Sequence, residues 1–315
     1  LAPRIRHRFV PLDVPRWIRR FLDGWQPDAA VFVESELWPN LIATLRRRGV
    51  PLALINGRMS ERSQRGWQRA PAFARELLGG FRLVLAQSEA DRLRFATLGA
   101  RDPLCWGNLK YAAAPLPAEG GELARMRALL GGRRVLLGAS THPGEEAIIA
   151  EAHARLAPRL PGLLTVIVPR HPQRGEAIAR ELAPHAVPRR AAGQDPGPDT
   201  GLYVADTLGE LGLFYRLADA AFVGGSLVRH GGQNPLDAAG LGSPIPFGPH
   251  TWNFEEPVAQ LLAVGGALRV EPGADPAGAL AEAAASVLSS PDRGKNMAAS
   301  AAAVAAGEAA LPSRI

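Results

Sequence analysis

The sequence predicts an α/β protein with two domains, each built on a parallel sheet wound with helices. Short apolar segments of strand length alternate with helical segments of about 10–12 residues, a pattern typical of such sheets. The alternation stops at a Pro-, Ala- and Gly-rich stretch, residues 112–121, and then starts again. We therefore predict a first domain at 1–111, a linker at 112–121 and a second domain at 122–315.

The first domain is expected to hold short buried strands separated by helices. Ser60 and Ser88 stand where two of the helices begin, and Ser60 is a plausible cap because its hydroxyl can accept a bond from an N–H group of the first turn. The predicted strands are residues 29–33, 51–55 and 83–86, and the predicted helices are residues 16–22, 37–48, 60–67 and 88–98.

The second domain repeats the same alternation. One helix opens with the acidic pair Glu145-Glu146, a composition that favours a helix start. Another helix is expected at 211–218, and Ala-rich helices close the chain. The predicted strands are residues 135–139, 164–168, 202–204, 220–223 and 243–247.

Composition and charge exclude several classes of protein. A single cysteine, Cys105, excludes a disulfide framework and a zinc site made of several cysteines. No run of about 18 apolar residues is present. Residues 1–70 hold 13 Arg against six acidic residues, whereas the remainder is nearly neutral. Such a basic region suits an anionic membrane or an acidic substrate, or is simply solvated; the absence of a basic motif interleaved with aromatic residues argues against nucleic acid.

Polar residues follow almost every predicted strand. Residues 140–142 (Ser-Thr-His) offer hydroxyls and N–H groups to an anion, or a helix cap. Arg170, which stands between prolines, can pair with phosphate or carboxylate. In residues 206–210, Asp206 or Thr207 could cap the next helix. Because open α/β sheets bind ligands beyond the carboxyl ends of their strands, these residues are candidates for one site.

Residues 224–254 carry the most chemical information. A strand runs into a Gly-rich loop, then Asn234-Pro235, then a helix with Asp237 in its first turn. Glycines allow a phosphate or sugar to approach the backbone, so we expect exposed N–H groups of this loop to bind an anion, with Asp237 accepting from sugar hydroxyls. An ordinary strand–loop–helix connection is the alternative.

Three charged residues of the first domain are candidates for catalysis. Glu34 and Glu36 lie just after a strand, where a carboxylate could perform acid–base work or stabilise charge. Lys110 precedes the predicted linker and could neutralise developing negative charge. For any of these residues alone, a structural or solvated role is the alternative.

Together, eight segments resemble the Kdo (3-deoxy-D-manno-octulosonic acid) transferase family. Any one of them is a weak signal, but as an ordered set spanning roughly residues 10–290 they are specific. The segments are ESELWPN (34–40), INGRMSERS (55–63), AQSEADRLRFATLGA (86–100), GNLK (107–110), ASTHPGEE (139–146), VPRHPQR (168–174), DTLGELGLFY (206–215) and AFVGGSLVRHGGQNPLDAAGLGSPIPFGPHTWNF (221–254).

The resemblance implies the GT-B fold, in which two Rossmann-like domains face a central cleft. It implies an inverting glycosyltransferase, without metal or cofactor, that moves Kdo from CMP-Kdo to a lipid A precursor (lipid IVA) at the cytoplasmic face of the inner membrane, in lipopolysaccharide core biosynthesis. The partial first domain would serve the acceptor and the second the donor. By resemblance, Glu36 and Lys110 stabilise the transition state, and the donor is bound by Pro169, Arg170, His171, Leu208, Gly209, Glu210, Asn234, Pro235, Leu236 and Asp237.

The sequence departs from the family pattern in places. The family's proton-accepting glutamate lies in a Ser-Val-Gly-Glu stretch that is absent here, and we expect it, with a hydrophobic anchor, upstream of Leu1. Gln233 stands where the family usually has His, and Asp237 where it has Glu. Two alternatives therefore stay open: an inactive fragment that binds nucleotide or lipid, and another GT-B enzyme that uses a UDP-sugar.

Overall fold

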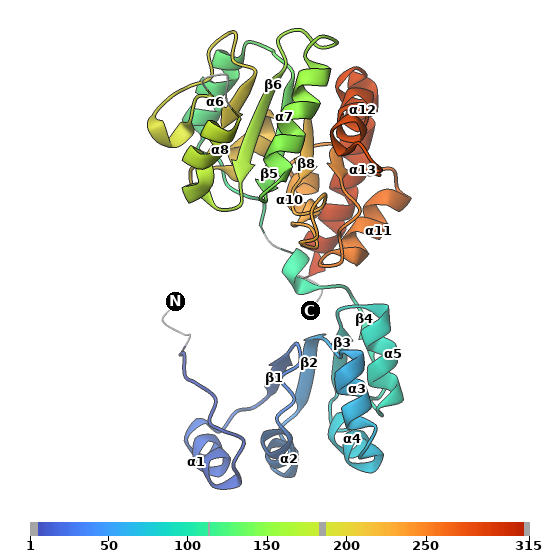
Figure 1. The fold of residues 1–315 in the computed structure, drawn as a ribbon. Helices are drawn as coiled ribbons and strands as arrows, with labels where there is room; N and C mark the ends of the chain where they lie inside the picture. Colours follow the sequence, from blue (N-terminus) through green and yellow to red (C-terminus); the bar gives the residue numbers. More distant parts are fainter. Residues whose placement is uncertain (1–5, 113, 183–186, 312–315) are drawn as a thin grey trace. The chain divides into compact units, whose positions relative to one another are not determined.

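The computed structural model describes residues 6–112, 114–182 and 187–311, apart from the side chain of Lys110. The chain divides into two compact units, unit 1 (Leu1–Ala112 with Leu311–Ile315) and unit 2 (Ala113–Ala310). Each unit is built on one parallel sheet with helices packed against it (Figure 1). The predicted α/β class with two parallel-sheet domains is thereby confirmed.

Unit 1 has a four-stranded parallel sheet in the order β1-β2-β3-β4. Because strand order follows chain order, right-handed crossovers place the connecting helices on one face of the sheet. The elements are α1 (Pro15–Trp25), β1 (Ala30–Val33), α2 (Pro39–Arg47), β2 (Leu52–Gly57), α3 (Glu61–Trp67), α4 (Pro71–Leu78), β3 (Leu83–Ala86), α5 (Glu89–Thr97), β4 (Leu104–Cys105) and the 3-10 turn η1 (Leu109–Tyr111).

The core of unit 1 lies between its helices and one face of its sheet. Ile18 of α1, Ile42 of α2 and Leu54 of β2 are buried there in one apolar cluster. Val31 and Val33 of β1 point the other way and are 58% and 45% exposed. Side chains alternate between the faces of a strand, so the second face of the sheet is open to solvent at β1.

The helices of unit 1 begin at identifiable caps. Ser60 accepts from the N–H of Ser63 at α3, as predicted, and Ser88 accepts from the N–H of Asp91 at α5. The start of α2 is capped from outside the helix by Asp13, whose two carboxylate oxygens each accept from a main-chain N–H, those of Asn40 and Leu41, at 2.9 Å.

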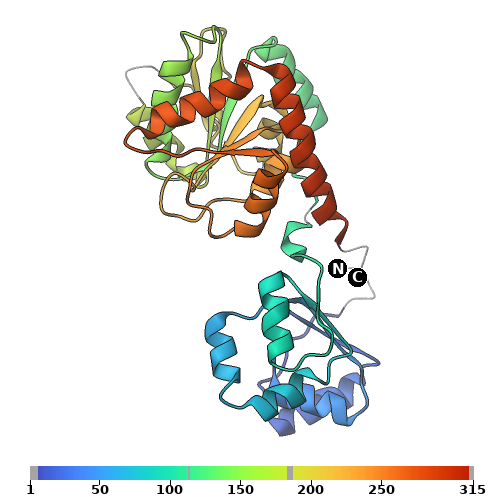
Figure 2. The same cartoon turned by 90° about the vertical axis from the view of Figure 1, so that its right-hand side faces the viewer.

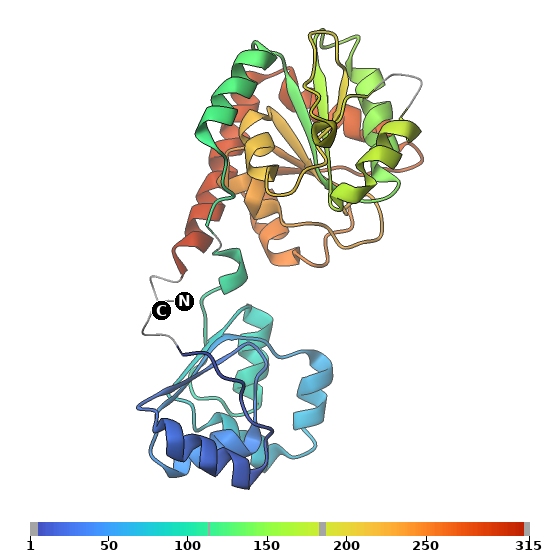
Figure 3. The same ribbon diagram turned by 90° about the vertical axis from the view of Figure 1, so that its left-hand side faces the viewer.

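Unit 2 has a six-stranded parallel sheet in the order β10-β9-β8-β5-β6-β7. Right-handed crossovers put α7 and α8 on one face, and α9, α10 and α11 on the other. Helix α12 packs along α7, and α6 packs on α9 at the opposite side (Figures 2 and 3). The elements are α6 (Gly120–Leu130), β5 (Val135–Thr141), α7 (Glu145–Leu156), β6 (Leu164–Pro169), η2 (Pro172–Arg174), α8 (Gly175–Glu181), η3 (Arg190–Ala192), β7 (Leu202–Val204), α9 (Leu211–Leu217), β8 (Ala220–Val223), α10 (Pro235–Gly240), β9 (Ile245–Phe247), α11 (Glu255–Ala263), β10 (Ala267–Arg269), α12 (Pro276–Leu288) and α13 (Pro291–Ala309).

Several elements escaped prediction. The edge strands β4 and β10 have two and three residues, too few for an apolar pattern to be read. Helix α6 begins at Gly120, inside the stretch predicted as a linker, because the Glu119 carboxylate caps it by accepting from the N–H groups of Gly121 and Glu122. Helices α4 and α8 were also missed; both are short, with eight and seven residues.

Replacing Asp13 tests the cap on α2. We expect Asp13→Ala to lower the free energy of unfolding by about 1–2 kcal/mol, because two N–H groups at the helix start lose their acceptor. The matched control is Asp23→Ala, which removes only an exposed ion pair with Arg48 and should cost less than about 0.5 kcal/mol. Urea unfolding measures both; equal losses would contradict the assigned cap.

Candidate functional site

The candidate donor site lies at the carboxyl ends of the unit 2 strands. Strands β5 and β8 are neighbours, but the chain leaves β5 in one direction across the sheet and returns to place β8 on its other side. Open α/β sheets bind ligands at such a switch point. His142 follows β5, Arg170 follows β6, and the Gly-rich stretch 224–234 follows β8.

A buried carboxylate holds the Gly-rich stretch to the start of α7. Glu145 is 0% exposed and accepts four main-chain N–H groups: Oε2 from His142 (2.9 Å) and Gly225 (2.7 Å), and Oε1 from Ser226 and Leu227 (both 3.0 Å). Burial raises the pKa of Glu145, and these bonds act in the opposite direction. Four N–H donors match the acceptor capacity of the ionised form.

Much of the main chain of the Gly-rich stretch is already hydrogen-bonded within the protein. Buried N–H groups must be satisfied within the protein, and here the protein itself supplies their acceptors. A ligand's negative charge cannot use the N–H groups bonded in this way, and exposed side chains beside the stretch are alternative donors. The N–H groups already bonded are those of Gly224, Gly225, Ser226, Leu227, His230, Gly232 and Gln233.

Two glycines of this stretch are required by close packing. A Cβ on Gly224 would lie 2.5 Å from the carbonyl oxygen of Ser140 in the neighbouring strand. Gly231 has a φ of +100°, and its Cβ would lie 2.4 Å from Nδ2 of Asn253. These glycines let the loop after β8 pack against β5 and against the loop after β9.

Three histidines meet beside the Gly-rich stretch. The ring of His142 lies 3.7 Å from that of His230, centroid to centroid, and 6.3 Å from that of His171, edge-on. Burial, and then the neighbouring rings, lower the pKa of His142 to about 4, so this ring is neutral at pH 7. Its Nε2 is 2.9 Å from the amide nitrogen of Gln233, which makes Nε2 the acceptor.

Arg170 and His171 are exposed next to this cluster. The N–H of Arg170 donates to the carbonyl oxygen of Thr141 at 3.0 Å, which fixes its backbone at the end of β5. Pro169 is the buried last residue of β6. The structure thus brings Arg170 and His171 together with the Gly-rich stretch through His142, as a common site requires.

Asn234 and Asp237 form the start of α10, as predicted. Asn234 Oδ1 accepts from the N–H of Leu236 at 3.1 Å, and its Nδ2 donates to Asp237 at 3.0 Å. Pro235 and Leu236 are buried. Burial raises the pKa of the half-buried Asp237 to about 6, although the Asn234 amide opposes this. Asp237 can therefore exchange a proton close to neutral pH.

The segment after β7 is held by arginines of the preceding loop. Arg190 pairs with Glu210 at 2.6 Å, and this hydrogen bonding lowers the pKa of Glu210. Leu208 is 84% exposed, and Gly209 has a φ of +84°. In the part of the chain that the structure describes, Glu210 is tied to Arg190, and no hydrogen bond or ion pair joins residues 208–210 to Arg170 or His171.

Two predictions, one about the cap of α9 and one about anion contacts after β5, are wrong. Asp206 does not cap α9, because its buried carboxylate pairs with Arg189 at 2.7 Å. Thr207 does not cap it either and instead donates to Glu210. Strand β5 runs through Thr141, whose buried hydroxyl donates to Glu146 at 2.9 Å. Because this hydroxyl donates its proton to a carboxylate of the protein, it is not available to bind an anion.

In unit 1, Glu36 lies beyond the end of β1. Its side chain is exposed, and Oε2 accepts from the indole N–H of Trp38 at 2.8 Å. Glu36 and Trp38 line an apolar cavity of about 380 Å³ with Phe21, Trp25 and Val33, among others. Lys110 is the middle residue of η1, and its side chain lies outside the described part of the chain.

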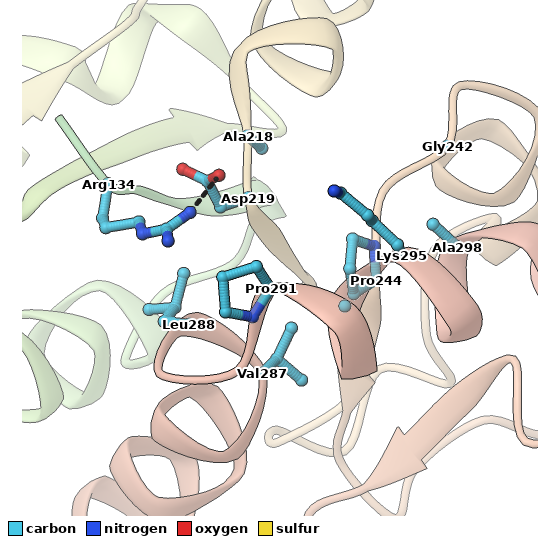
Figure 4. Close-up of a pocket in the computed structure, with 11 residues that line it drawn as sticks. Arg134, Ala218, Asp219, Gly242, Pro244, Val287, Leu288, Pro291, Lys295 and Ala298 are labelled. Carbon is cyan, nitrogen blue, oxygen red and sulfur yellow. Dashed lines mark hydrogen bonds and ion pairs between the residues drawn. The ribbon is translucent and has the colours of Figure 1, made fainter. Parts of the chain in front are cut away.

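A further cavity of about 190 Å³ lies at the other end of the unit 2 sheet. Arg134, Asp219 and Pro244 line it, and they directly precede strands β5, β8 and β9. Figure 4 shows the Arg134–Asp219 ion pair and Lys295 of α13 at this cavity. Because it lies at the amino ends of the strands, this cavity is not part of the candidate site.

The family assignment follows from comparison with known proteins. Residues 1–113 match the family described as 3-deoxy-D-manno-octulosonic-acid transferase (kdotransferase). The crystal structure of the C-terminal CMP-Kdo binding domain of WaaA from Acinetobacter baumannii is 31% identical, with a TM-score of 0.53, over 98% of that chain and 59% of this one. The chain belongs to the Kdo transferase family.

Other relatives agree with this assignment. The 3-deoxy-D-manno-octulosonic acid transferase of Bordetella pertussis is 40% identical over 274 residues, which are 84% of this chain and 63% of that protein. This Kdo transferase chain thus spans less than two thirds of that relative's length. A UDP-GlcNAc 2-epimerase from Neisseria meningitidis matches 90% of the chain at a TM-score of 0.54 with 14% identity. That likeness concerns the fold alone, and it agrees with the predicted GT-B class.

Sequence reasoning missed the residues that hold the site together. Glu145 had been interpreted only as a helix opener, yet it organises the Gly-rich stretch. Arg189 and Arg190, which pair with Asp206 and Glu210, were not singled out at all. The available signal for Glu145 was its place in a polar motif shortly after a strand, a signal that Arg189 and Arg190 lack.

The raised pKa of Asp237 predicts how the free energy of unfolding depends on pH. A carboxyl with a raised folded-state pKa adds stability below its unfolded pKa, near 3.8, and loses it as pH rises through about 6. We expect Asp237→Asn to become more stable than the unaltered protein, by roughly 1–3 kcal/mol, between pH 4 and pH 7. Urea unfolding at several pH values measures this gap; two curves that stay parallel would refute the shift.

Proposed function

We propose that this protein transfers Kdo from CMP-Kdo to a lipid A precursor, lipid IVA, in lipopolysaccharide core biosynthesis. The observation that carries the proposal is the 31% identity to a CMP-Kdo binding domain over 98% of that domain. The matched share of this chain, 59%, is close to the share that unit 2 occupies. Unit 2 is accordingly the donor domain and unit 1 the acceptor-side domain.

In the donor site, side chains meet the charge of the CMP group. Arg170 is exposed and can pair with two phosphate oxygens, with His171 beside it. The negative charge that grows on the departing CMP is stabilised by the same side chains, so we propose an inverting displacement without a metal ion. Residues 234–237 take the ribose and phosphate side, and residues 208–210 complete the cytidine site.

On the acceptor side, Glu36 and Lys110 stabilise the transition state. The apolar cavity beside Glu36 suits the acyl part of an amphiphilic acceptor, and the basic residues of α1 suit its phosphates and an anionic membrane surface. The proposed place of action is the cytoplasmic face of the inner membrane. Among the described residues, no helix is long and apolar enough to cross a bilayer.

Calorimetric titration with nucleotides tests the donor assignment. We expect CMP to bind more tightly than UDP or ADP, and Arg170→Ala to weaken CMP binding by roughly 1–3 kcal/mol through loss of a charge-assisted contact. The matched control is Arg180→Ala, which removes an exposed arginine of α8. Its guanidinium nitrogen lies 4.0 Å from a carboxylate oxygen of Glu176 on the same helix. That variant should bind CMP normally.

The outcomes separate the proposal from its alternatives. A preference for UDP would favour a GT-B enzyme that uses a UDP-sugar. Binding of CMP without Kdo transfer to lipid IVA would favour a nucleotide- or lipid-binding fragment. An unchanged CMP affinity in Arg170→Ala would remove that residue from the site.

A further inference from the structure

Two residues with left-handed backbone end neighbouring strands of unit 1. Glu34, just after β1, has a φ of +59°. Asn56, the second-last residue of β2, has a φ of +51°. Such values are uncommon for residues with a side chain and cluster at functional sites, and asparagine tolerates them best. The N–H of Glu34 donates to the carbonyl oxygen of Ile55 at 3.1 Å, and the N–H of Arg58 donates to the carbonyl oxygen of Glu34 at 3.3 Å. The two strand ends are thus tied together.

The side chain of Asn56 makes a long-range bond to the main chain. It is 3% exposed, and its Oδ1 accepts from the N–H of Leu109 at 2.9 Å, 53 residues further along. The register of β2 against β3 shifts between Leu54 and Gly57, so Asn56 lies within a strand irregularity that redirects its side chain.

This bond secures the start of η1. Leu109 is the first residue of that turn, which closes through a bond of 2.9 Å from the N–H of Tyr111 to the carbonyl oxygen of Asn108. The first N–H groups of a helical turn have no partner inside it. Asn56 supplies an acceptor for one of them, and Lys110 is the next residue along the turn.

We propose that Asn56 is a positioning residue for Lys110. The inference rests on the proposed function, in which Lys110 stabilises the transition state. The Asn56 carboxamide fixes the backbone of η1 at the carboxyl ends of the unit 1 strands, where the Glu36 loop also lies. In that loop the Ser35 hydroxyl donates to the carbonyl oxygen of Arg58 at 3.0 Å. Asn56 thereby sets the place of Lys110 relative to that loop within unit 1.

Asn56→Gly separates this role from backbone strain. Glycine adopts a φ of +51° freely, so the variant removes the acceptor without a conformational conflict. Measured on protein that carries the glutamate expected upstream of Leu1, kcat for Kdo transfer should fall by about 10- to 100-fold through misplacement of a catalytic group. The CMP dissociation constant should change by less than about twofold, because donor binding belongs to unit 2. Amide exchange at Leu109 should become faster.

A double-variant comparison identifies the residue through which Asn56 acts. In a Lys110→Ala background, adding Asn56→Gly should lower kcat by no more than about twofold, since the group to be positioned is gone. Thr44→Ala is the matched control, because it removes another buried side chain that bonds the main chain of unit 1. The Thr44 hydroxyl donates to the carbonyl oxygen of Asn40 at 2.7 Å and accepts from Arg47 at 3.0 Å, and its loss should leave kcat unchanged.

The outcomes are distinguishable. Full activity of Asn56→Gly, or an equal loss with and without Lys110, would overturn the positioning role and leave the proposed function intact. An equal loss in Thr44→Ala would also overturn it, because the effect would then follow from general loosening of unit 1. Absence of Kdo transfer by the unaltered protein, measured with the segment expected upstream of Leu1 in place, would instead contradict the proposed function.

Discussion

The candidate donor site depends on the buried carboxylate of Glu145. Three of its four hydrogen bonds join the start of α7 to a loop 80 to 82 residues further along the chain, and the fourth accepts from the nearby N–H of His142. The held loop organises the next one, because the Ser226 hydroxyl accepts from the N–H of Gly248 at 2.9 Å. A buried carboxylate is costly unless its acceptors are all used, so this arrangement favours one conformation of both loops.

The same interaction determines how a ligand can be held. Because Glu145 uses the N–H groups of Gly225, Ser226 and Leu227, charge on a nucleotide needs other donors, and the exposed side chains of Arg170 and His171 can supply them. His142, neutral and buried under these groups, supports them without adding charge. Unit 1 follows the same principle, since the Asn56 side chain satisfies a main-chain N–H at a strand end. In both units, long-range side-chain bonds fix polar segments that no sheet ladder can hold.

The fold was largely predictable from the sequence, and the site only in part. Apolar periodicity located most strands, and local caps such as Ser60 and Asn234 were read from residue type and position. Edge strands such as β4 were too short to show a pattern. The roles of Glu145 and Asn56 depend on partners 53 or more residues away, and no local pattern reveals such contacts. The resemblance named candidate residues, but not the contacts that hold them.

Glu145→Gln tests the central claim most directly, with CMP affinity measured by calorimetry. The variant keeps the shape but turns an N–H₂ group toward main-chain donors, leaving N–H groups unsatisfied. We predict a folded protein that binds CMP roughly 10- to 100-fold more weakly. Glu151→Gln, altered at an exposed ion pair on the same helix, should bind normally. Unchanged CMP affinity in Glu145→Gln would contradict the account.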